Sequence, residues 1–181
     1  MKKVLSTIFL FVLFLPFMIS AQTVVNVASD AFGGNGGNLN KAVAAAVTAG
    51  TLSNTVFQLE PYGYYILTGV IEVPAGKKLT ITAPDPGTTQ ATALPQILWT
   101  AAAGVTTTNS FAVFGDISLK NIWLLCANVL GDQVGSSVGL KDNPGVTKTA
   151  DFDGCLFEYS NVSGDGAAIG ITCSAVNLTI K

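Results

Sequence analysis

The chain has 181 residues and a net charge of −2 at pH 7, and 49% of its residues are hydrophobic whereas only 11% are charged. It contains no arginine and no histidine, so no cationic track is available to neutralise phosphates, and we expect no nucleic-acid partner. Such sparse charge is typical of a sheet-rich protein and argues against a helical or disordered chain.

Residues 1–21 have the pattern of a secretory signal peptide. Two lysines follow the first Met, residues 4–19 carry no charge, and the expected cleavage site lies between Ala21 and Gln22. A retained membrane anchor is the alternative, but the apolar run is shorter than about 18 residues and Pro16 interrupts it. We therefore predict an exported protein, secreted or attached to the cell surface, with no membrane span after signal cleavage.

Residues 22–54 are expected to form an N-terminal unit ahead of a longer sheet region. A short strand at 23–27 is followed by a glycine-rich loop at 29–38 and an alanine-rich helix at 39–49. The loop does not match the dinucleotide-binding fingerprint, because Leu39 stands where the third glycine should be.

The predicted helix has one apolar stripe at helical spacing, which would pack against the rest of the protein. The stripe consists of Leu39, Val43, Ala46 and Val47. We expect Asn38 to cap the first turn of the helix and Gly50 to end it.

From residue 55 to residue 181 the pattern changes to short apolar runs separated by Gly, Pro, Asn and Asp. The expected strands lie at 56–59, 64–67, 70–73, 79–82, 97–99, 111–114, 117–119, 122–126, 138–140, 155–159, 169–173 and 176–180. Two all-β architectures fit such runs: a sandwich of two sheets, or a solenoid whose coils each hold two or three short strands.

A repeat favours the solenoid. Residues 119–124 and 152–157 share the order apolar, polar, Asn or Gly, apolar, any residue, apolar. Residues 79–81 and 176–180 look like incomplete copies of the same unit. In a coil, this order places a bend between two strands that both turn side chains inward.

The order of these parts resembles right-handed parallel β-helix proteins of the pectin-lyase-like superfamily, in particular the exported bacterial ones. The resemblance rests on the early strand, the glycine-rich loop, the helix, and the segments 55–59, 62–65 and 71–81, the last of which is similar to the superfamily's first full coil. It implies an all-β fold, with a right-handed parallel β-helix at 55–181 and a capping α-helix at its N-terminal end. Its motifs are architectural, so they indicate a fold more than an activity.

Stacking of Leu119 beneath Phe152 would bring the outward neighbours Lys120 and Asp153 to about 4.8 Å on adjacent coils. They would then form a surface ion pair, which stabilises a protein little. Asp151 projects from the same outer face as Asp153, and together with further oxygen ligands the two carboxylates could instead hold Ca²⁺. We expect no metal and no cofactor, with Ca²⁺ at Asp151 and Asp153 as the alternative.

The resemblance also implies polysaccharide as a partner. Lyases of the superfamily often combine Ca²⁺ with a basic side chain, and its inverting hydrolases use several aspartates with His, Arg and Lys on consecutive coils. Here Arg and His are absent and the lysines are scattered. Residues 1–181 therefore show no catalytic constellation, and whether the protein is an enzyme stays open.

Trp123 completes the candidate substrate-binding set of Trp123, Asp151 and Asp153. It stands between the inward Ile122 and Leu124, and alternation therefore points it outward. An exposed indole could stack on a sugar ring, whereas the alternative is that a following loop covers it.

Three cysteines, Cys126, Cys155 and Cys173, cannot all pair within one chain. Each lies in an apolar alternating segment, so they are expected to be small buried hydrophobic residues, with one disulfide as the alternative. The last predicted strand, 176–180, faces inward just before residue 181. A solenoid must cover its last coil, and we therefore expect a front fragment of a longer protein or a partner at this end.

Two functional hypotheses follow from these patterns. The first is an exported β-helix protein that binds extracellular polysaccharide and, in a full-length form, degrades it. The second is a non-enzymatic cell-surface or adhesion solenoid, which the absence of Arg and His favours.

Overall fold

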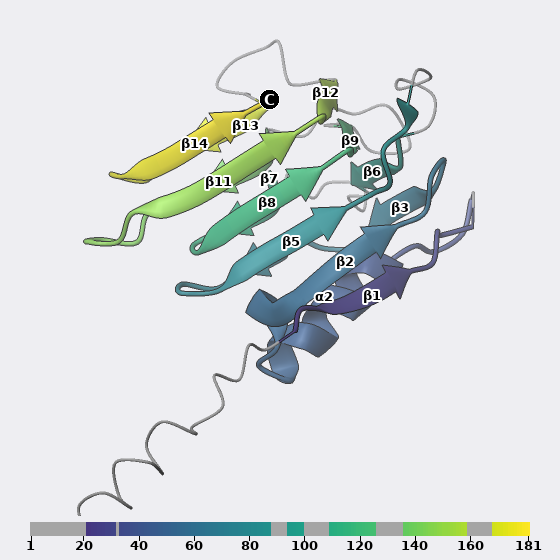
Figure 1. Cartoon of the computed structure of the whole chain (residues 1–181), viewed down its shortest axis with the longest axis horizontal. Helices are drawn as coiled ribbons and strands as arrows, with labels where there is room; N and C mark the ends of the chain where they lie inside the picture. The colour runs from purple at the N-terminus through teal and green to yellow at the C-terminus, as the bar shows by residue number, and fades with distance from the viewer. Residues whose placement is uncertain (1–20, 32, 88–93, 100–108, 126–135, 159–167) are drawn as a thin grey trace, which may run out of the picture.

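The computed structural model describes residues 21–31, 33–87, 94–99, 109–125, 136–158 and 168–181. In this part the chain folds as an all-β, parallel, solenoid-like structure with little helix, as the repeat predicted (Figure 1). The predicted strands are present, with ends shifted by one or two residues. No helix in these ranges is long and apolar enough to cross a membrane. The predicted signal peptide lies outside the described residues, apart from Ala21.

Three sheets make up the fold, and the chain visits them in a fixed order, coil after coil. Sheet A has six strands in the order β1 (Thr23–Val27), β2 (Thr55–Leu59), β5 (Lys78–Thr82), β8 (Asp116–Lys120), β11 (Lys148–Asp153) and β14 (Val176–Ile180). Sheet B consists of β3 (Tyr64–Leu67), β6 (Gln96–Trp99), β9 (Trp123–Leu125) and β12 (Leu156–Glu158). Sheet C consists of β4 (Ile71–Val73), β7 (Asn109–Val113), β10 (Ser136–Leu140) and β13 (Ile169–Ile171). Every neighbouring pair of strands in these sheets is parallel.

The core lies between the three sheets and is built from apolar side chains stacked in register. In sheet A, Phe57 pairs with Ile81, which pairs with Leu119. Leu119 in turn pairs with Phe152, as predicted. All four side chains are buried, because every second residue of each strand points to the inside of the coil.

The predicted bend between sheets A and B is confirmed. Asn121 and Gly154 both adopt a left-handed backbone, with φ of 57° and 61°, a conformation that Gly and Asn tolerate best. The Asn121 side chain donates a hydrogen bond of 3.1 Å to the carbonyl of Ala83 in the coil below. Its backbone N–H donates to the carbonyl of Asp153 in the coil above, so each bend is tied to its neighbours.

Helix α2 (Asn38–Thr48) covers the N-terminal end of the stack and packs against β1, β2 and β3 (Figure 1). Leu39, Val43 and Ala46 are buried as predicted, but Val47 is 39% exposed, so its assignment to the buried stripe was wrong. Gly50 follows the helix with a φ of 71° and its N–H donates to Val47, which agrees with its predicted role. A short 3₁₀ turn, η1 (Leu52–Asn54), leads into β2.

Asn38 does not cap helix α2, contrary to prediction. The capping position is Gly37, which has a φ of 92° and no side chain to bond. The buried Asp30 takes over part of this role, because its Oδ1 accepts the Asn38 N–H at 3.1 Å and its Oδ2 accepts the Ile66 N–H at 2.8 Å. The loop therefore joins the helix to the edge of sheet B.

Strand β11 was not predicted, and its composition explains why. Only Ala150 and Phe152 are apolar, and Lys148 occupies an inward position where the pattern calls for an apolar residue. Lys148 is 1% exposed, and its Nζ has no hydrogen-bond partner among the residues that the structure describes. The stacking of β11 between β8 and β14 thus places a cation where the sequence pattern argues against one.

Cys155 and Cys173 are free thiols and half-buried, whereas Cys126 lies outside the described residues. The Cys155 Sγ donates to the carbonyl of Leu119 at 3.4 Å. Burial raises the pKa of the Cys155 thiol above its usual value, which makes its reactive thiolate scarcer at neutral pH. No disulfide joins Cys155 to Cys173.

Candidate functional site

The outer faces of the three sheets differ in chemistry. On sheet B, one outward row consists of Ile66, Leu98, Leu125 and Glu158. On sheet C, an outward row consists of Glu72, Ala112, Gly139 and Gly170. Sheet A instead carries hydroxyl, carboxylate, amide and ammonium groups along several coils, and its outer face is the one on which polar groups gather.

Two outward rows of sheet A form the candidate site. The first row runs through Thr80, Ser118, Asp151 and Thr179. The second row runs through Gln58, Thr82, Lys120 and Asp153. Because paired strands lie about 4.8 Å apart, each row repeats its polar groups at that spacing along the stack.

Asp151 has the most available carboxylate of this face. It is half-buried, pairs in register with Ser118 below and Thr179 above, and no hydrogen bond or ion pair engages its oxygens within the described part of the chain. A carboxylate accepts several hydrogen bonds. Asp151 can therefore accept hydrogen bonds from an external ligand between two hydroxyl groups.

Asp153 forms the ion pair that the repeat predicted. Its Oδ2 lies 3.6 Å from the Nζ of Lys120, and both side chains are about half exposed. An exposed pair of this kind is screened by water and contributes little to stability. Because Asp153 is paired with Lys120, one of the two carboxylates considered for Ca²⁺ is already engaged by a cation.

Asp116 is a third carboxylate on this face and was missed by sequence analysis. Its Oδ1 accepts the backbone N–H of Thr149 at 2.7 Å, which ties β8 to β11. Lys78 is its register partner on β5. The register of Leu119 with Phe152 could have revealed Asp116, because counting back along β8 places it on the same outer face.

The described residues contain no group of three or more His, Cys, Asp or Glu side chains arranged to hold a metal ion. Asp151 and Asp153 do lie on one face, as alternation predicted, two positions apart on β11. Two carboxylates with one engaged by Lys120 fall short of the six to eight oxygen ligands that Ca²⁺ takes.

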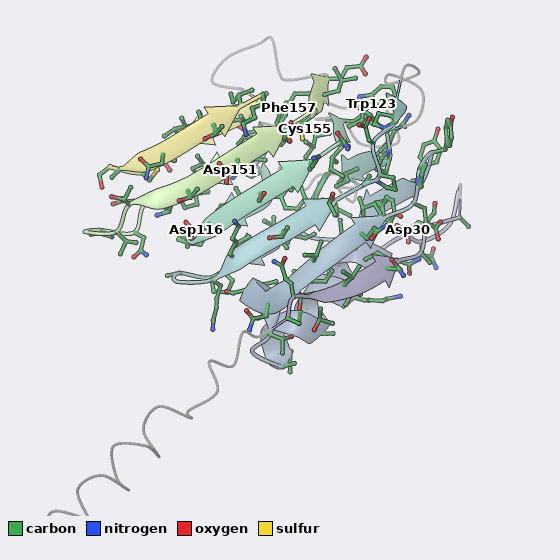
Figure 2. The ribbon with its side chains drawn as sticks, in the orientation of Figure 1. Asp30, Asp116, Trp123, Asp151, Cys155 and Phe157 are labelled. Atoms are coloured by element: carbon green, nitrogen blue, oxygen red, sulfur yellow. The ribbon has the colours of Figure 1, made fainter. Side chains whose placement is uncertain are left out.

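Trp123 lies apart from Asp151 and Asp153. It belongs to sheet B, where its register partners are Gln96 and Leu156, and Figure 2 shows it on the far side of the bend from Asp151. Its side chain points outward as predicted but is half-buried, and its buried Nε1 finds no hydrogen-bond partner within the described ranges. The three candidate residues therefore occupy two faces and do not form one site.

The arrangement on sheet A suits hydrogen bonding to a polyhydroxylated surface. The hydroxyls of Ser118 and Thr179 flank the Asp151 carboxylate, and Lys120 offers N–H groups two residues along β8 from Ser118. The polar side chains of this face are hydroxyls, carboxylates, an amide and an ammonium group, all of which form hydrogen bonds. The geometry supports binding more directly than it supports a reaction.

Comparison with known proteins identifies no relative: no family model, no curated protein and no solved structure matches this chain.

Proposed function

We propose that this chain is an exported right-handed parallel β-helix protein that binds extracellular polysaccharide along the outer face of sheet A. The observation that carries the proposal is the row of Ser118, Asp151 and Thr179, in which an unengaged carboxylate lies between two hydroxyls. Parallel coils repeat such groups at a constant spacing. A repeating glycan chain presents its own hydroxyls at regular intervals.

The fold supports this assignment indirectly. Three parallel sheets with a helix over one end are the architecture that the pectin-lyase-like superfamily implies. The signal-like residues 1–21 place the protein outside the cytoplasm in this proposal, either secreted or at the cell surface. Fold resemblance alone says little about activity, so the polar face of sheet A carries the argument.

Binding to a panel of soluble neutral and acidic polysaccharides tests the proposal. Asp151→Asn and Ser118→Ala should weaken binding, and we expect about tenfold or more for Asp151→Asn because a hydrogen bond to a charged group contributes about 1.5–3 kcal/mol. Glu72→Gln on sheet C is the matched control, since it removes one carboxylate from a different outer face. Binding that Asp151→Asn leaves unchanged would contradict the proposed site.

The rival proposal is a non-enzymatic surface or adhesion solenoid. The absence of Arg and His from the chain favours it, because polysaccharide-degrading members of the superfamily rely on such side chains. A folded protein that binds no glycan of the panel but attaches to cells would support this second function. Glycan binding with loss of affinity in Asp151→Asn would support the first.

A further inference from the structure

The bend between sheets A and B in the first coil has an unusual residue at its left-handed position. Tyr62 has a φ of 60° and lies two residues before β3, as Asn121 lies two before β9 and Gly154 two before β12. The left-handed backbone is tolerated by Gly and Asn and is strained for a bulky side chain. Two later coils therefore place a tolerant residue at this bend, whereas the first coil places a tyrosine there.

The turn explains the backbone conformation but not the choice of side chain. The Gly63 N–H donates to the Glu60 carbonyl at 3.1 Å, which closes a four-residue turn with Pro61 and Tyr62 at its centre. A positive φ at the second central position is typical of a type II turn, which prefers Gly or Asn there. Asparagine at this position would thus satisfy the turn with less backbone strain.

The Tyr62 ring projects into solvent rather than into the core, since its side chain is 64% exposed. The neighbouring Tyr65 is fully buried, and its hydroxyl holds the bend from inside through the Val27 carbonyl and the Glu60 N–H. Gly63 is required beside it, because an added Cβ would lie 2.8 Å from the Tyr65 ring. A strained backbone that carries an exposed aromatic side chain indicates a role outside the core, because such strain gathers at functional sites.

Tyr62 also borders the polar face of sheet A. Strand β2 ends three residues before it, and Gln58 of that strand belongs to the second polar row, together with Thr82 and Lys120. Asp151 lies three strands further along the sheet, which corresponds to about 14 Å because paired strands are about 4.8 Å apart. A chain-like ligand that runs along the stack therefore reaches both ends of this distance.

We propose that the Tyr62 ring is a stacking platform for one sugar ring of the polysaccharide, an inference that rests on the proposed function of sheet A. An aromatic face attracts the C–H groups on the apolar face of a pyranose, while the phenolic hydroxyl stays in water. Stacking of this kind needs no charge on the ligand, so it complements the hydrogen bonds at Asp151. Tyr62 then serves binding and not stability, and the two properties should respond to substitution in opposite directions.

Tyr62→Asn tests this inference because it should strengthen the fold and weaken binding. The melting temperature should rise by about 2 °C or more, since asparagine tolerates the left-handed backbone. Affinity electrophoresis in gels that contain a soluble neutral β-glucan or polygalacturonate should show an affinity at least about threefold lower. Tyr62→Phe keeps the ring and should retain most of the affinity. Val70→Asn is the matched control, because it removes a 38% exposed side chain at the next bend of the same coil.

Unchanged affinity in Tyr62→Asn, together with the expected loss in Asp151→Asn, would overturn this inference and leave the function of sheet A standing. A lower melting temperature in Tyr62→Asn would also overturn it, because the ring would then serve the fold. An equal loss of affinity in Tyr62→Phe would contradict stacking and assign the contact to the hydroxyl, and an equal loss in Val70→Asn would show that the effect is not specific to Tyr62. A wild-type chain that binds neither polysaccharide would overturn the proposed function as well.

Discussion

At the N-terminal end of the stack Leu39 and Val43 of helix α2 are buried against the core, whereas at the C-terminal end Leu178 and Ile180 are exposed. Both ends belong to the same three-sheet core of the described residues. The difference lies in residues 28–54, which do not follow the coil pattern and instead supply a helix and a loop. A stack of similar coils cannot cover its own end. Each coil covers the one before it but exposes the same kind of edge in turn, so a different structure is needed to cover the outermost coil.

The N-terminal closure uses hydrogen bonds as well as apolar packing. The free edge of β3 is satisfied by the glycine-rich segment: the Ile66 carbonyl accepts the Gly37 N–H, and Ser29 accepts the Tyr64 N–H through its hydroxyl. Gly36 comes so close to Ile66 that an added Cβ would lie 2.6 Å from that carbonyl oxygen. Glycine at this position is therefore required by close approach of two backbones.

Truncating an apolar side chain should destabilise the protein far more at the N-terminal end of the stack than at the C-terminal end. Leu39→Ala in α2 should destabilise the protein by about 2–5 kcal/mol, because a fully buried leucine leaves a cavity. Ile180→Ala, at the exposed end, should cost less than about 1 kcal/mol because the side chain is mostly exposed. Urea unfolding followed by circular dichroism measures both. Equal losses would show that the two ends are closed alike.

Lys148→Met should stabilise the protein by about 1–3 kcal/mol. The ammonium group is buried beneath β14 and has no hydrogen-bond partner in the described part of the chain. Methionine fills similar space without the desolvation cost of a charge. Urea unfolding at neutral pH gives the difference. Lys41→Met, on the exposed side of α2, is the control and should change stability little. A loss of stability in Lys148→Met would mean that the ammonium is satisfied in the folded protein.

Tyr65→Phe should destabilise the N-terminal end by about 1–2 kcal/mol. The Tyr65 hydroxyl donates to the Val27 carbonyl and accepts the Glu60 N–H, both at 2.8 Å, so its loss removes two hydrogen bonds and leaves the buried Val27 carbonyl without this donor. Thermal unfolding checks this change. Tyr62→Phe, at an exposed turn position, is the matched control.

The same tyrosine makes stability depend on alkaline pH. Burial raises the pKa of Tyr65 above its ordinary value of 10.0. The neutral phenol is thus favoured in the folded state, and its stabilisation is complete below pH 10 and lost as the pH rises above 10. The difference between wild type and Tyr65→Phe should shrink over that range. A constant difference up to pH 11 would contradict the assignment.

The smallest effect is expected at the Lys120–Asp153 ion pair. Lys120→Met should change stability by less than about 1 kcal/mol, because both side chains are about half exposed. The change should shrink further in high salt, which screens exposed charges. Thermal unfolding at two salt concentrations measures it, and a larger, salt-independent loss would show that the pair is more deeply desolvated than the fold indicates.

Sequence analysis located most of the fold because its signals were local. Alternation placed Phe152 inward and Asp151 outward, and the repeat aligned Lys120 with Asp153. It missed β11 because the inward Lys148 disrupts the apolar pattern, and it assigned the helix cap to Asn38 because the capping group, Asp30, lies eight residues away in sequence.

The candidate site was less predictable than the fold. Alternation gave the outward direction of Trp123 and Asp151 but not the sheets to which they belong. Only the coil register shows that Trp123 lies on sheet B between Gln96 and Leu156, and that Asp151 lies on sheet A between two hydroxyls. The distribution of polar groups over three faces depends on contacts between residues far apart in the chain.

By itself, the sequence determined the strand pattern, the bends at Asn121 and Gly154, and the helix that precedes the coils, because each depends on spacing and backbone preference within a few residues. The tertiary structure decided which end of the core is closed, where Lys148 is buried and which carboxylate remains unengaged. Those properties arise from the stacking of coils 20 or more residues apart, as in the pairing of Val56 with Thr80, and no local pattern encodes them.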